Sequence, residues 1–508
     1  MGFTDRLRAR ARLAFHDDSL TLATLARRVA DAHGDRVLVS VPSGLTWSAA
    51  QVAGAVDRAA EVIAALISPG ERVLIDYPNG PELILGCLAV CAAGGIAVPV
   101  NDASTAAERA HVRKDSGATL TLTDPMLLAP TLIARHHEPV AVFPSDVAVL
   151  LYTSGTTGKP KGAALTHRGL LVSTRRLALL PTGLRHDEMV MALPLAHVMG
   201  FAGFLGTLSS GMSAFVFPKF RPNDVLDAIE SRRSSVFVGV PAMYRMMLEA
   251  GATQRDLTCI RVWMSGADVM PADLARQFQR MGATATLPII GASVGEALFV
   301  EGYGMVELSG AAIMKVTPPY AGGVLTKARG ASLPGVKTRV VDEAGATVRI
   351  GQVGELLITG PGVLKGYFGD PAATTAAVTN DGWVRTGDLV RRGLAGTVEF
   401  VGRAKDVIKV GGYSVYAAEV QTALEAQPGV AEAAVTGLPD ARKGEQVVAA
   451  VRVLPGCSVD VDALRAALAE SLAAYKVPAV ISVVDSLPRT TTGKIKRAEL
   501  QALLAGSQ

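Results

Sequence analysis

The chain has 508 residues, of which 49% are hydrophobic and 19% charged, and its formal net charge at pH 7 is +4. This composition excludes an intrinsically disordered protein, and so small a charge gives no support to nucleic-acid binding. Because a single hydrophobic core stops growing at about 250–300 residues, the length predicts at least two domains.

Four arginines lie near the N-terminus: Arg6, Arg8, Arg10 and Arg12. No apolar segment of the length that a signal peptide requires follows them. We expect a solvated helix there, with a peripheral membrane contact as the alternative. The cysteines lack metal-site spacing, and Cys87 and Cys91 stand among apolar residues, so they are expected to be inert core thiols. These features favour the cytoplasm, and they leave a homodimer open.

Strand-like and helix-like segments alternate through the first hundred residues. Short apolar runs predict strands at 36–40, 73–75 and 96–100. Ser48 is a suitable N-cap for a helix whose apolar positions are Val52, Val56, Val62, Ile63 and Leu66. The apolar run 83–100 is interrupted by glycine and proline, so it predicts a core helix and a buried strand and not a membrane span. This alternation predicts an α/β fold with a mostly parallel sheet.

A loop rich in glycine and hydroxyl residues follows the apolar run 147–151. Its sequence is Tyr152-Thr-Ser-Gly-Thr-Thr-Gly-Lys-Pro-Lys-Gly162. Glycines allow close approach of the backbone, successive N–H groups can form an anion-binding concavity, and Lys159 and Lys161 add positive charge. A polyphosphate ligand is therefore expected. The P-loop motif is disfavoured because only two residues separate Gly155 from Gly158 and a proline follows the lysine.

The middle of the chain continues the α/β pattern. Strands are expected at 188–195, 235–240 and 260–264, with a helix starting at Pro241. His197 follows the first of these strands between apolar residues, and the loop Ser265-Gly-Ala-Asp268 follows the third. The segment 282–301 has no assigned role beyond the idea that it reshapes the substrate tunnel.

Four more motifs complete the series. They are Gly302-Tyr-Gly-Met-Val-Glu307, Gly382-Trp-Val-Arg-Thr-Gly-Asp388, Gly402-Arg-Ala-Lys-Asp-Val-Ile-Lys-Val-Gly-Gly-Tyr-Ser-Val-Tyr416 and Leu487-Pro-Arg-Thr-Thr-Thr-Gly-Lys-Ile-Lys496. Together with the glycine-rich loop they closely resemble the motifs of the adenylate-forming superfamily, which holds the acyl-CoA synthetases, the adenylation domains of peptide synthetases and the beetle luciferases. The resemblance extends from Tyr152 to Lys494, in family order.

The resemblance implies a large N-terminal domain of parallel-sheet α/β subdomains with a small β-rich subdomain, followed by a small mobile α/β C-terminal domain. The expected boundaries are 1–402 for the first domain, 403–409 for the hinge and 410–508 for the second domain. The implied chemistry is that of an acid–thiol ligase. A carboxylate attacks the α-phosphate of ATP, pyrophosphate leaves, and coenzyme A takes the acyl group from acyl-AMP.

The resemblance also implies residue roles. Lys494 would neutralise charge during adenylation, Glu307 with Thr153 would hold Mg²⁺, and His197 would lie between the acyl and nucleotide pockets. The ATP-binding loop would comprise Thr153, Ser154, Gly155, Thr156, Thr157, Gly158 and Lys159. The other nucleotide, hinge and thiol-approach positions would be Tyr303 and Gly304 at adenine, Asp388 and Arg403 at ribose, Lys405 at the hinge, and Gly411 and Gly412 at the coenzyme A thiol. Lys496 and Arg497 have no implied role and are expected to be solvated.

The expected acyl pocket is apolar, which favours a medium- or long-chain fatty acid. Its expected wall comprises Val198, Met199, Phe201, Phe204, Val238 and Met243, with Gly266 and Ala267 in the adjoining loop. Three alternatives stay open. A carrier-protein phosphopantetheine could be the acceptor, or Arg245 could hold the second carboxylate of a dicarboxylic acid such as malonate. The chain could also be a non-catalytic acyl- or nucleotide-binding homologue.

The last alternative is motivated by Val306, since the superfamily usually has a threonine there whose hydroxyl reaches the α-phosphate. Loss of one hydrogen bond to a charged group costs about 1.5–3 kcal/mol, or about ten- to a hundredfold in rate. Two outcomes stay open: the enzyme is slow, or a neighbouring hydroxyl such as that of Ser309 substitutes for the missing one.

Overall fold

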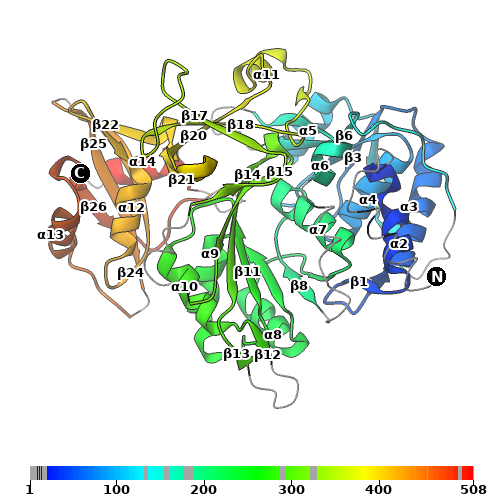
Figure 1. The fold of residues 1–508 in the computed structure, drawn as a ribbon, viewed down its shortest axis with the longest axis horizontal. Coiled ribbons are helices and arrows are strands. Elements are labelled where there is room, and N and C mark those ends of the chain that lie inside the picture. The colour runs from blue at the N-terminus through cyan, green and yellow to red at the C-terminus, as the bar shows by residue number, and fades with distance from the viewer. Residues whose placement is uncertain are drawn as a thin grey trace. The chain divides into compact units, whose positions relative to one another are not determined.

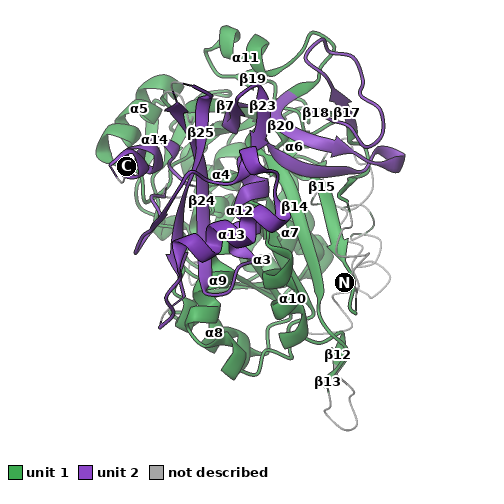
Figure 2. Cartoon of the chain, turned by 90° about the vertical axis from the view of Figure 1, so that its left-hand side faces the viewer, with its two compact units in different colours: residues 1–337, 358–384 green, residues 338–357, 385–508 purple. Residues whose placement is uncertain are grey.

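The structure is a computed structural model, and the residues it describes are 9, 11, 13, 20–130, 136–153, 159–172, 174, 187–286, 293–320, 329–440, 442–454, 456–489 and 495–506. The N-terminal arginines therefore lie outside the described residues. The chain divides into two compact units (Figure 2). Unit 1 comprises Met1–Lys337 and Ile358–Val384, and unit 2 comprises Thr338–Leu357 and Arg385–Gln508.

Unit 1 is built on two large sheets (Figure 1). The first sheet has nine strands in the order β16 (Ala331–Ser332), β15 (Gly310–Thr317), β14 (Leu298–Met305), β11 (Val262–Gly266), β10 (Val236–Gly239), β8 (Glu188–Met191), β9 (Ser213–Val216), β1 (Val37–Ser40) and β2 (Thr46–Ser48). The strands from β14 to β1 pair in parallel, and antiparallel strands close both ends.

The second sheet has six strands in the order β19 (Gly366–Tyr367), β7 (Lys161–Thr166), β6 (Val147–Thr153), β4 (Ile96–Pro99), β3 (Arg72–Ile75) and β5 (Leu120–Leu122). Its strands from β6 to β5 are parallel. A two-stranded hairpin is formed by β12 (Ala285–Thr286) and β13 (Ser293–Val294). The predicted parallel α/β fold is confirmed.

The helices in the described part of unit 1 are α2 (Leu22–His33), α3 (Ala49–Ala64), α4 (Pro81–Ala92), α5 (Ala106–Ser116), α6 (His167–Val172), α7 (Val198–Ser210), α8 (Pro222–Arg232), α9 (Pro241–Glu249), α10 (Ala272–Met281) and α11 (Pro371–Ala377). Short 3₁₀ turns lie at Met126–Leu128, Ala252–Gln254 and Val306–Leu308. The predicted cap of α3 is confirmed, because the Ser48 side chain accepts a hydrogen bond from the Gln51 backbone. A proline begins α9 as predicted, and a proline also begins α4.

Some local predictions need correction. The strand predicted at 188–195 ends at Met191, and the rest of that run is a turn. In α3, Val52, Val56 and Ile63 face the core, whereas Val62 is 41% exposed and Leu66 lies beyond the helix at 60%. The apolar run 83–100 forms α4 and β4, and no helix within the described ranges has both the length and the apolar character to cross a bilayer.

Aromatic packing explains why α9 and α10 lie against the larger sheet. The rings of Phe237, Tyr244, Trp263 and Phe278 meet in edge-to-face pairs with centroids 4.8–6.0 Å apart. The hydroxyl of Tyr244 donates to the carbonyl of Met264 at 2.7 Å, so this buried phenol is satisfied. Tyr244 and Met247 are therefore core residues of α9.

Burial also settles the reactivity of the two neighbouring thiols. Cys87 and Cys91 lie in α4 with no exposed surface, as predicted. Desolvation raises the pKa of the Cys91 thiol to about 12 and the pKa of Cys87 well above its usual range. Since the thiolate is the nucleophilic form, both are inert at neutral pH.

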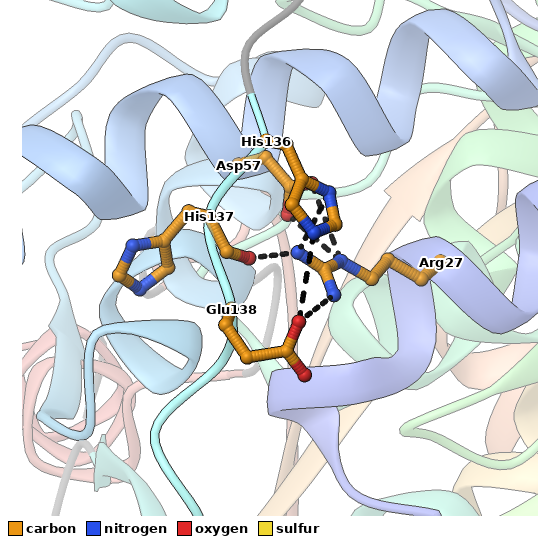
Figure 3. Close-up of polar contacts among 5 residues, drawn as sticks. All are labelled: Arg27, Asp57, His136, His137 and Glu138. Carbon is orange, nitrogen blue, oxygen red and sulfur yellow. Dashed lines mark hydrogen bonds and ion pairs between the residues drawn. The ribbon is translucent and has the colours of Figure 1, made fainter.

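The segment that leads into β6 is anchored to α2 and α3 by one guanidinium (Figure 3). Arg27 of α2 pairs with Asp57 of α3 at 3.2 Å and with Glu138 at 2.9 Å, and it also donates to the carbonyl of His137. Because the carboxylate of Asp57 is only 8% exposed, its pairing with Arg27 offsets the cost of burying a charge.

Unit 2 has two sheets. The four-stranded sheet has the order β17 (Lys337–Val341), β18 (Val353–Thr359), β20 (Val384–Arg392) and β21 (Val398–Arg403). The five-stranded sheet has the order β23 (Tyr413–Tyr416), β22 (Val407–Val410), β25 (Gly444–Val453) and β24 (Val430–Asp440), with β26 (Val480–Val483) also paired to β25. The helices are α12 (Ala417–Glu425), α13 (Val461–Ser471) and α14 (Arg497–Ala505), with 3₁₀ turns at Leu394–Gly396, Ala404–Asp406 and Ala474–Lys476.

Alternate residues of β25 explain how the five-stranded sheet is covered. Val447, Ala449 and Val451 belong to the core under α12 and α13, whereas Val448 and Ala450 belong to the core under α14. Successive side chains of a strand point to opposite faces, so this sheet is buried on both sides. The smaller α/β domain expected at the C-terminal end is confirmed.

A buried histidine makes the stability of unit 1 sensitive to pH. His167 begins α6 with 1% of its surface exposed, and its Nδ1 accepts a hydrogen bond from the backbone of Leu22 at 3.2 Å. Burial lowers the pKa of this imidazole from 6.5 to about 4. The neutral ring therefore stabilises the fold fully above pH 6.5, and this contribution is lost as the pH falls towards 4.

We expect the free energy of unfolding to fall by about 3 kcal/mol between pH 7 and pH 4 through His167 alone. In His167→Gln, an amide oxygen can accept the same hydrogen bond without titrating, so the dependence on pH should flatten. Urea unfolding midpoints of both proteins at pH 7, 5.5 and 4 measure this. Parallel pH dependences in the two proteins would show that His167 does not carry the effect.

Candidate active site

The glycine-rich loop joins two antiparallel strands of the second sheet. β6 ends at Thr153 and β7 begins at Lys161, and these two residues face each other in the ladder. The loop positions Ser154, Gly155, Thr156, Thr157 and Gly158 lie outside the described residues. Lys159 is exposed, whereas Lys161 forms an ion pair with Asp370 at 3.2 Å. Of the two lysines expected to add charge to this loop, Lys161 therefore has a carboxylate partner within unit 1.

The motif at 302–307 runs from the end of β14 into a 3₁₀ turn. Tyr303 is half-buried in β14, and Glu307 in the turn is 9% exposed. A Cβ added at Gly304 would lie 2.0 Å from the carbonyl oxygen of Gly310, so the paired strand leaves no room for a side chain there. This glycine is explained by backbone contact.

Glu307 has a tyrosine partner that the sequence did not reveal. The hydroxyl of Tyr367 donates to Oε1 of Glu307 at 2.5 Å, and burial together with this carboxylate raises the pKa of Tyr367. The bond fixes one carboxylate oxygen and leaves the other oxygen as the natural ligand for a cation. A carboxylate suits Mg²⁺, which is usually held by one or two carboxylates together with substrate phosphates.

The structure does not support Ser309 as the substitute for the hydroxyl that is missing at Val306. Ser309 is 1% exposed, and its hydroxyl donates to the carbonyl of Gly362 at 2.7 Å. Its hydrogen is thus engaged inside unit 1, which argues against donation to a phosphate. Val306 itself is 9% exposed.

His197 occupies the N-cap of α7. Its Nδ1 accepts a hydrogen bond from the backbone of Met199 at 3.4 Å. Met199 in turn lies against the end of β11, because a Cβ added at Gly266 would meet the Met199 side chain at 3.3 Å and the carbonyl of Gly302 at 2.9 Å. The structure therefore brings together His197, Met199 and Gly266 beside β14. Ala267 follows in the left-handed region with φ of 66°.

The other expected acyl-pocket residues are more dispersed. Phe201 has no exposed surface within α7 and is a core residue in this structure, so its burial does not support a place in the pocket wall. Val238 is buried in β10, and Met243 lies half-buried at the first turn of α9, near Gly239. Arg245 is also half-buried on α9.

Asn79 supports the candidate site, and nothing in the sequence identified it. Its side-chain oxygen accepts from the backbone of Leu195 at 2.7 Å, and its amide nitrogen donates to the carbonyls of Leu193 and Pro218, both at 3.2 Å. Asn79 is 8% exposed. One amide after β3 thus ties down the segment before His197 and the segment after β9.

We expect Asn79→Ala to lower the free energy of unfolding by about 1–3 kcal/mol, because buried backbone groups lose their partner. It should also slow the adenylation that the resemblance implies, through displacement of His197. Asn101→Ala is the matched control, since Asn101 also accepts from a backbone N–H, that of Ala103, but in a more exposed turn. Urea unfolding and pyrophosphate release measure the two effects, and equal behaviour of both variants would contradict the assigned role.

In unit 2 the two expected ribose residues face each other. Asp388 in β20 is opposite Arg403 in β21, and their side chains form an ion pair at 3.0 Å. Asp388 is 3% exposed, and its backbone N–H donates to the hydroxyl of Thr386 at 3.1 Å. A buried carboxylate held by a guanidinium is suited to accept hydrogen bonds from hydroxyl groups.

The expected hinge and thiol-approach residues lie at the next two turns. Lys405 is in the 3₁₀ turn Ala404–Asp406, and burial lowers the pKa of its ammonium. Gly411 and Gly412 join β22 to β23 with φ of 57° and 87°. Two consecutive left-handed positions explain why both are glycine.

Residues 490–494, Lys494 among them, lie outside the described residues, but the chain is described up to Arg489 and again from Ile495. Arg489 and Ile495 form an antiparallel bridge, and the backbone of Lys496 donates to the carbonyl of Pro488 at 2.9 Å. Lys496 is exposed, as expected, and pairs with Glu499 at 2.8 Å. The expectation that Arg497 is solvated is wrong, since its side chain contacts the 3₁₀ turn at Lys405 and Asp406.

Comparison with known proteins gives consistent matches over nearly the whole chain. The family described as AMP-binding enzyme matches residues 25–368, and the family described as AMP-binding enzyme C-terminal domain matches residues 419–494. A feruloyl-CoA synthase of Amycolatopsis sp is 35% identical over 460 residues, which cover 86% of this chain and 90% of that protein.

Two further similarities are of the same kind. A fatty acid–[acyl-carrier-protein] ligase of Streptomyces coeruleorubidus is 33% identical over 475 residues, covering 86% of this chain and 88% of that protein. The solved structure of ATP-bound MatB from Rhodopseudomonas palustris has a TM-score of 0.80 and 31% identity, and it covers 95% of this chain and 98% of its own.

Proposed function

The chain belongs to the AMP-binding enzyme family, and on that basis we propose that it is an ATP-dependent acid–thiol ligase that forms an acyl-CoA. The observation that carries the proposal is that both family regions match in order, with about a third of residues identical to named ligases over most of the chain. The polar residues of the candidate site support the same chemistry.

The first half-reaction joins the acid to AMP. A carboxylate oxygen attacks the α-phosphorus of ATP, the bond to the β-phosphate oxygen breaks, and pyrophosphate leaves. We assign charge neutralisation to Lys494 and the loop Thr153–Lys159, and the holding of Mg²⁺ to Glu307 with Thr153. Tyr303 would stack on adenine, and the Asp388–Arg403 pair would receive the ribose hydroxyls. Mg²⁺, when bound, would supply further charge stabilisation at the phosphates.

The second half-reaction releases AMP. The thiol sulfur of coenzyme A attacks the acyl carbonyl carbon, the C–S bond forms, and AMP departs with the electrons of the broken C–O bond. No side chain serves as a covalent nucleophile, which agrees with the burial of Cys87, Cys91 and Cys259. We assign the change between half-reactions to rotation of residues 410–508 about the hinge 403–409.

The acid remains the finer part of the proposal. A medium- or long-chain fatty acid is our first candidate, since Met199, Val238 and Met243 offer an apolar environment. The similarity to a feruloyl-CoA synthase makes a hydroxycinnamic acid the principal rival, and half-buried Arg245 is the observation behind a dicarboxylic acid. The similarity to a ligase that loads an acyl carrier protein makes that acceptor the second candidate function. We place the enzyme in the cytoplasm, where four unpaired thiols are stable.

Pyrophosphate release with ATP and Mg²⁺ across a panel of acids tests the proposal. The panel runs from acetate to palmitate and includes ferulate, benzoate and malonate, each with and without coenzyme A. Release that depends on one acid class and forms an acyl-CoA supports the ligase. Adenylation without acyl-CoA favours a carrier-protein acceptor. Silence with every acid, in a protein that still binds ATP, points to the non-catalytic alternative, which an inactive Val306→Thr variant would support.

A further inference from the structure

Arg497 connects the last helix to the turn that contains the proposed hinge residue. Its Nη1 donates to the carbonyl oxygen of Lys405 at 2.5 Å and to Oδ1 of Asp406 at 2.8 Å. Its Nε donates to the hydroxyl of Thr436, a residue of β24 that is 2% exposed, at 3.2 Å. One guanidinium therefore bonds both to the hinge turn and to the five-stranded sheet.

The helix that carries Arg497, α14, is packed against the five-stranded sheet. Leu500 and Leu504 of α14 are buried in the core that also contains Leu438 and Val448 of the sheet. Gln501, one turn after Arg497, donates to the carbonyl of Gly437 at 2.9 Å. The guanidinium is thus presented from a packed helix.

The position of the accepting carbonyl decides what the contact does. A peptide unit is planar, so the carbonyl oxygen of Lys405 moves as one piece with the N–H of Asp406. Rotation about the Cα–C bond of Lys405 therefore leaves this oxygen fixed relative to Asp406 and β22. Both contacts of Nη1 can persist while the chain before Lys405 changes direction.

We propose that Arg497 is a positioning residue that fixes the 405–406 peptide to the C-terminal body and confines hinge rotation to the backbone bonds that precede this peptide. The inference rests on the hinge role of Lys405 proposed above. Arg497 would add a restraint to that hinge. Because few backbone bonds remain free to rotate, the C-terminal body would stop at defined orientations.

The same residue also relates the hinge to the adenylation lysine. Arg497 follows Lys494 by three positions, and the chain between 489 and 495 is closed by the bridge of Arg489 with Ile495. Arg489 is paired with Glu432, which is 6% exposed in β24. The base of the Lys494 segment and the hinge turn are therefore attached to one strand, so that they move as one body.

Distance measurements between spin labels can test the restraint in the full-length protein. One label goes on Cys457, which is exposed, while the other three cysteines are buried. The second goes on Leu66→Cys in unit 1, where the leucine is 60% exposed. Distances are recorded with ATP and Mg²⁺, and then with coenzyme A and a non-hydrolysable acyl-adenylate analogue.

In the otherwise unaltered protein we expect one narrow distance distribution in each ligand state, at different distances. Arg497→Ala should broaden both, and it should lower kcat for acyl-CoA formation about tenfold with KM values nearly unchanged. Arg497→Lys retains the charge but not the three simultaneous bonds, so its distributions should be intermediate. Asp406→Asn, which leaves Arg497 in place, should broaden them to a smaller extent.

Arg465→Ala is the matched control, because Arg465 of α13 also forms an ion pair, with Asp462 at 2.9 Å, and is similarly exposed. It should keep both narrow distributions. If the unaltered protein shifts between two distances and Arg497→Ala shows equally narrow distributions, the proposed restraint by Arg497 is refuted. If the unaltered protein shows the same distance in both states while it forms acyl-CoA, the hinge itself fails and the inference falls with it.

Discussion

Replacement of Lys494 by alanine is expected to lower acyl-adenylate formation at least about a hundredfold. It should leave thioester formation from supplied acyl-AMP close to that of the unaltered protein. The ammonium is assigned to the bond-forming step at the α-phosphorus, where negative charge develops, and the thiol step no longer involves that centre. Pyrophosphate release measures the first half-reaction, and acyl-CoA formation from synthetic acyl-AMP measures the second.

Lys496→Ala is a close control for this experiment. Lys496 stands two positions away, is exposed and pairs only locally with Glu499 at 2.8 Å, so its loss should change neither half-reaction appreciably. An equal loss of both half-reactions in Lys494→Ala would mean that the division of roles is wrong. An equal loss of adenylation in both lysine variants would mean that general positive charge in this segment matters and not the single ammonium.

The second large effect is expected at Glu307. Glu307→Gln keeps the shape of the side chain but removes the charge assigned to Mg²⁺, so kcat for adenylation should fall about a hundredfold and the Mg²⁺ concentration for half-maximal rate should rise. The measurement is pyrophosphate release across a Mg²⁺ titration. A variant with the unaltered Mg²⁺ dependence would remove Glu307 from the metal site.

Tyr367→Phe separates the charge of Glu307 from its orientation. The phenylalanine lacks the hydroxyl that donates to Glu307 at 2.5 Å, while the carboxylate remains. Loss of one hydrogen bond to a charged group should slow adenylation about tenfold or more, with the Mg²⁺ dependence largely kept. If the two variants are indistinguishable, the tyrosine holds the carboxylate in its only useful position.

The sequence alone predicted the features that depend on residues close together along the chain. The cap at Ser48 and the helix start at Pro241 follow from local backbone chemistry, and both were correct. The strand predicted at 188–195 was too long because apolar composition alone does not show where strand pairing stops. Here it stops at Met191, and Pro194 lies in the turn that follows.

The supporting contacts of the candidate site could not be predicted in this way. Asn79 bonds to Leu195 across 116 positions, and Arg497 bonds to Lys405 across 92 positions. Neither residue carries a local signal, since an asparagine in a turn and an arginine at a helix start are both common. The motif residues themselves were named from resemblance, and their partners, such as Tyr367 for Glu307, required the fold.

The two groups of supporting contacts differ in their electrical character. Asn79 is uncharged, so its bonds around the segment before His197 are indifferent to ionic strength. The pair of Arg497 with Asp406 joins two partly exposed charges, with side chains 34% and 37% exposed, and dissolved salt weakens such pairs. High salt should therefore loosen the turn to which we assign domain rotation, while the segment before His197 keeps its geometry. Ionic strength thus offers a reversible way to disturb one half of the catalytic cycle without any mutation.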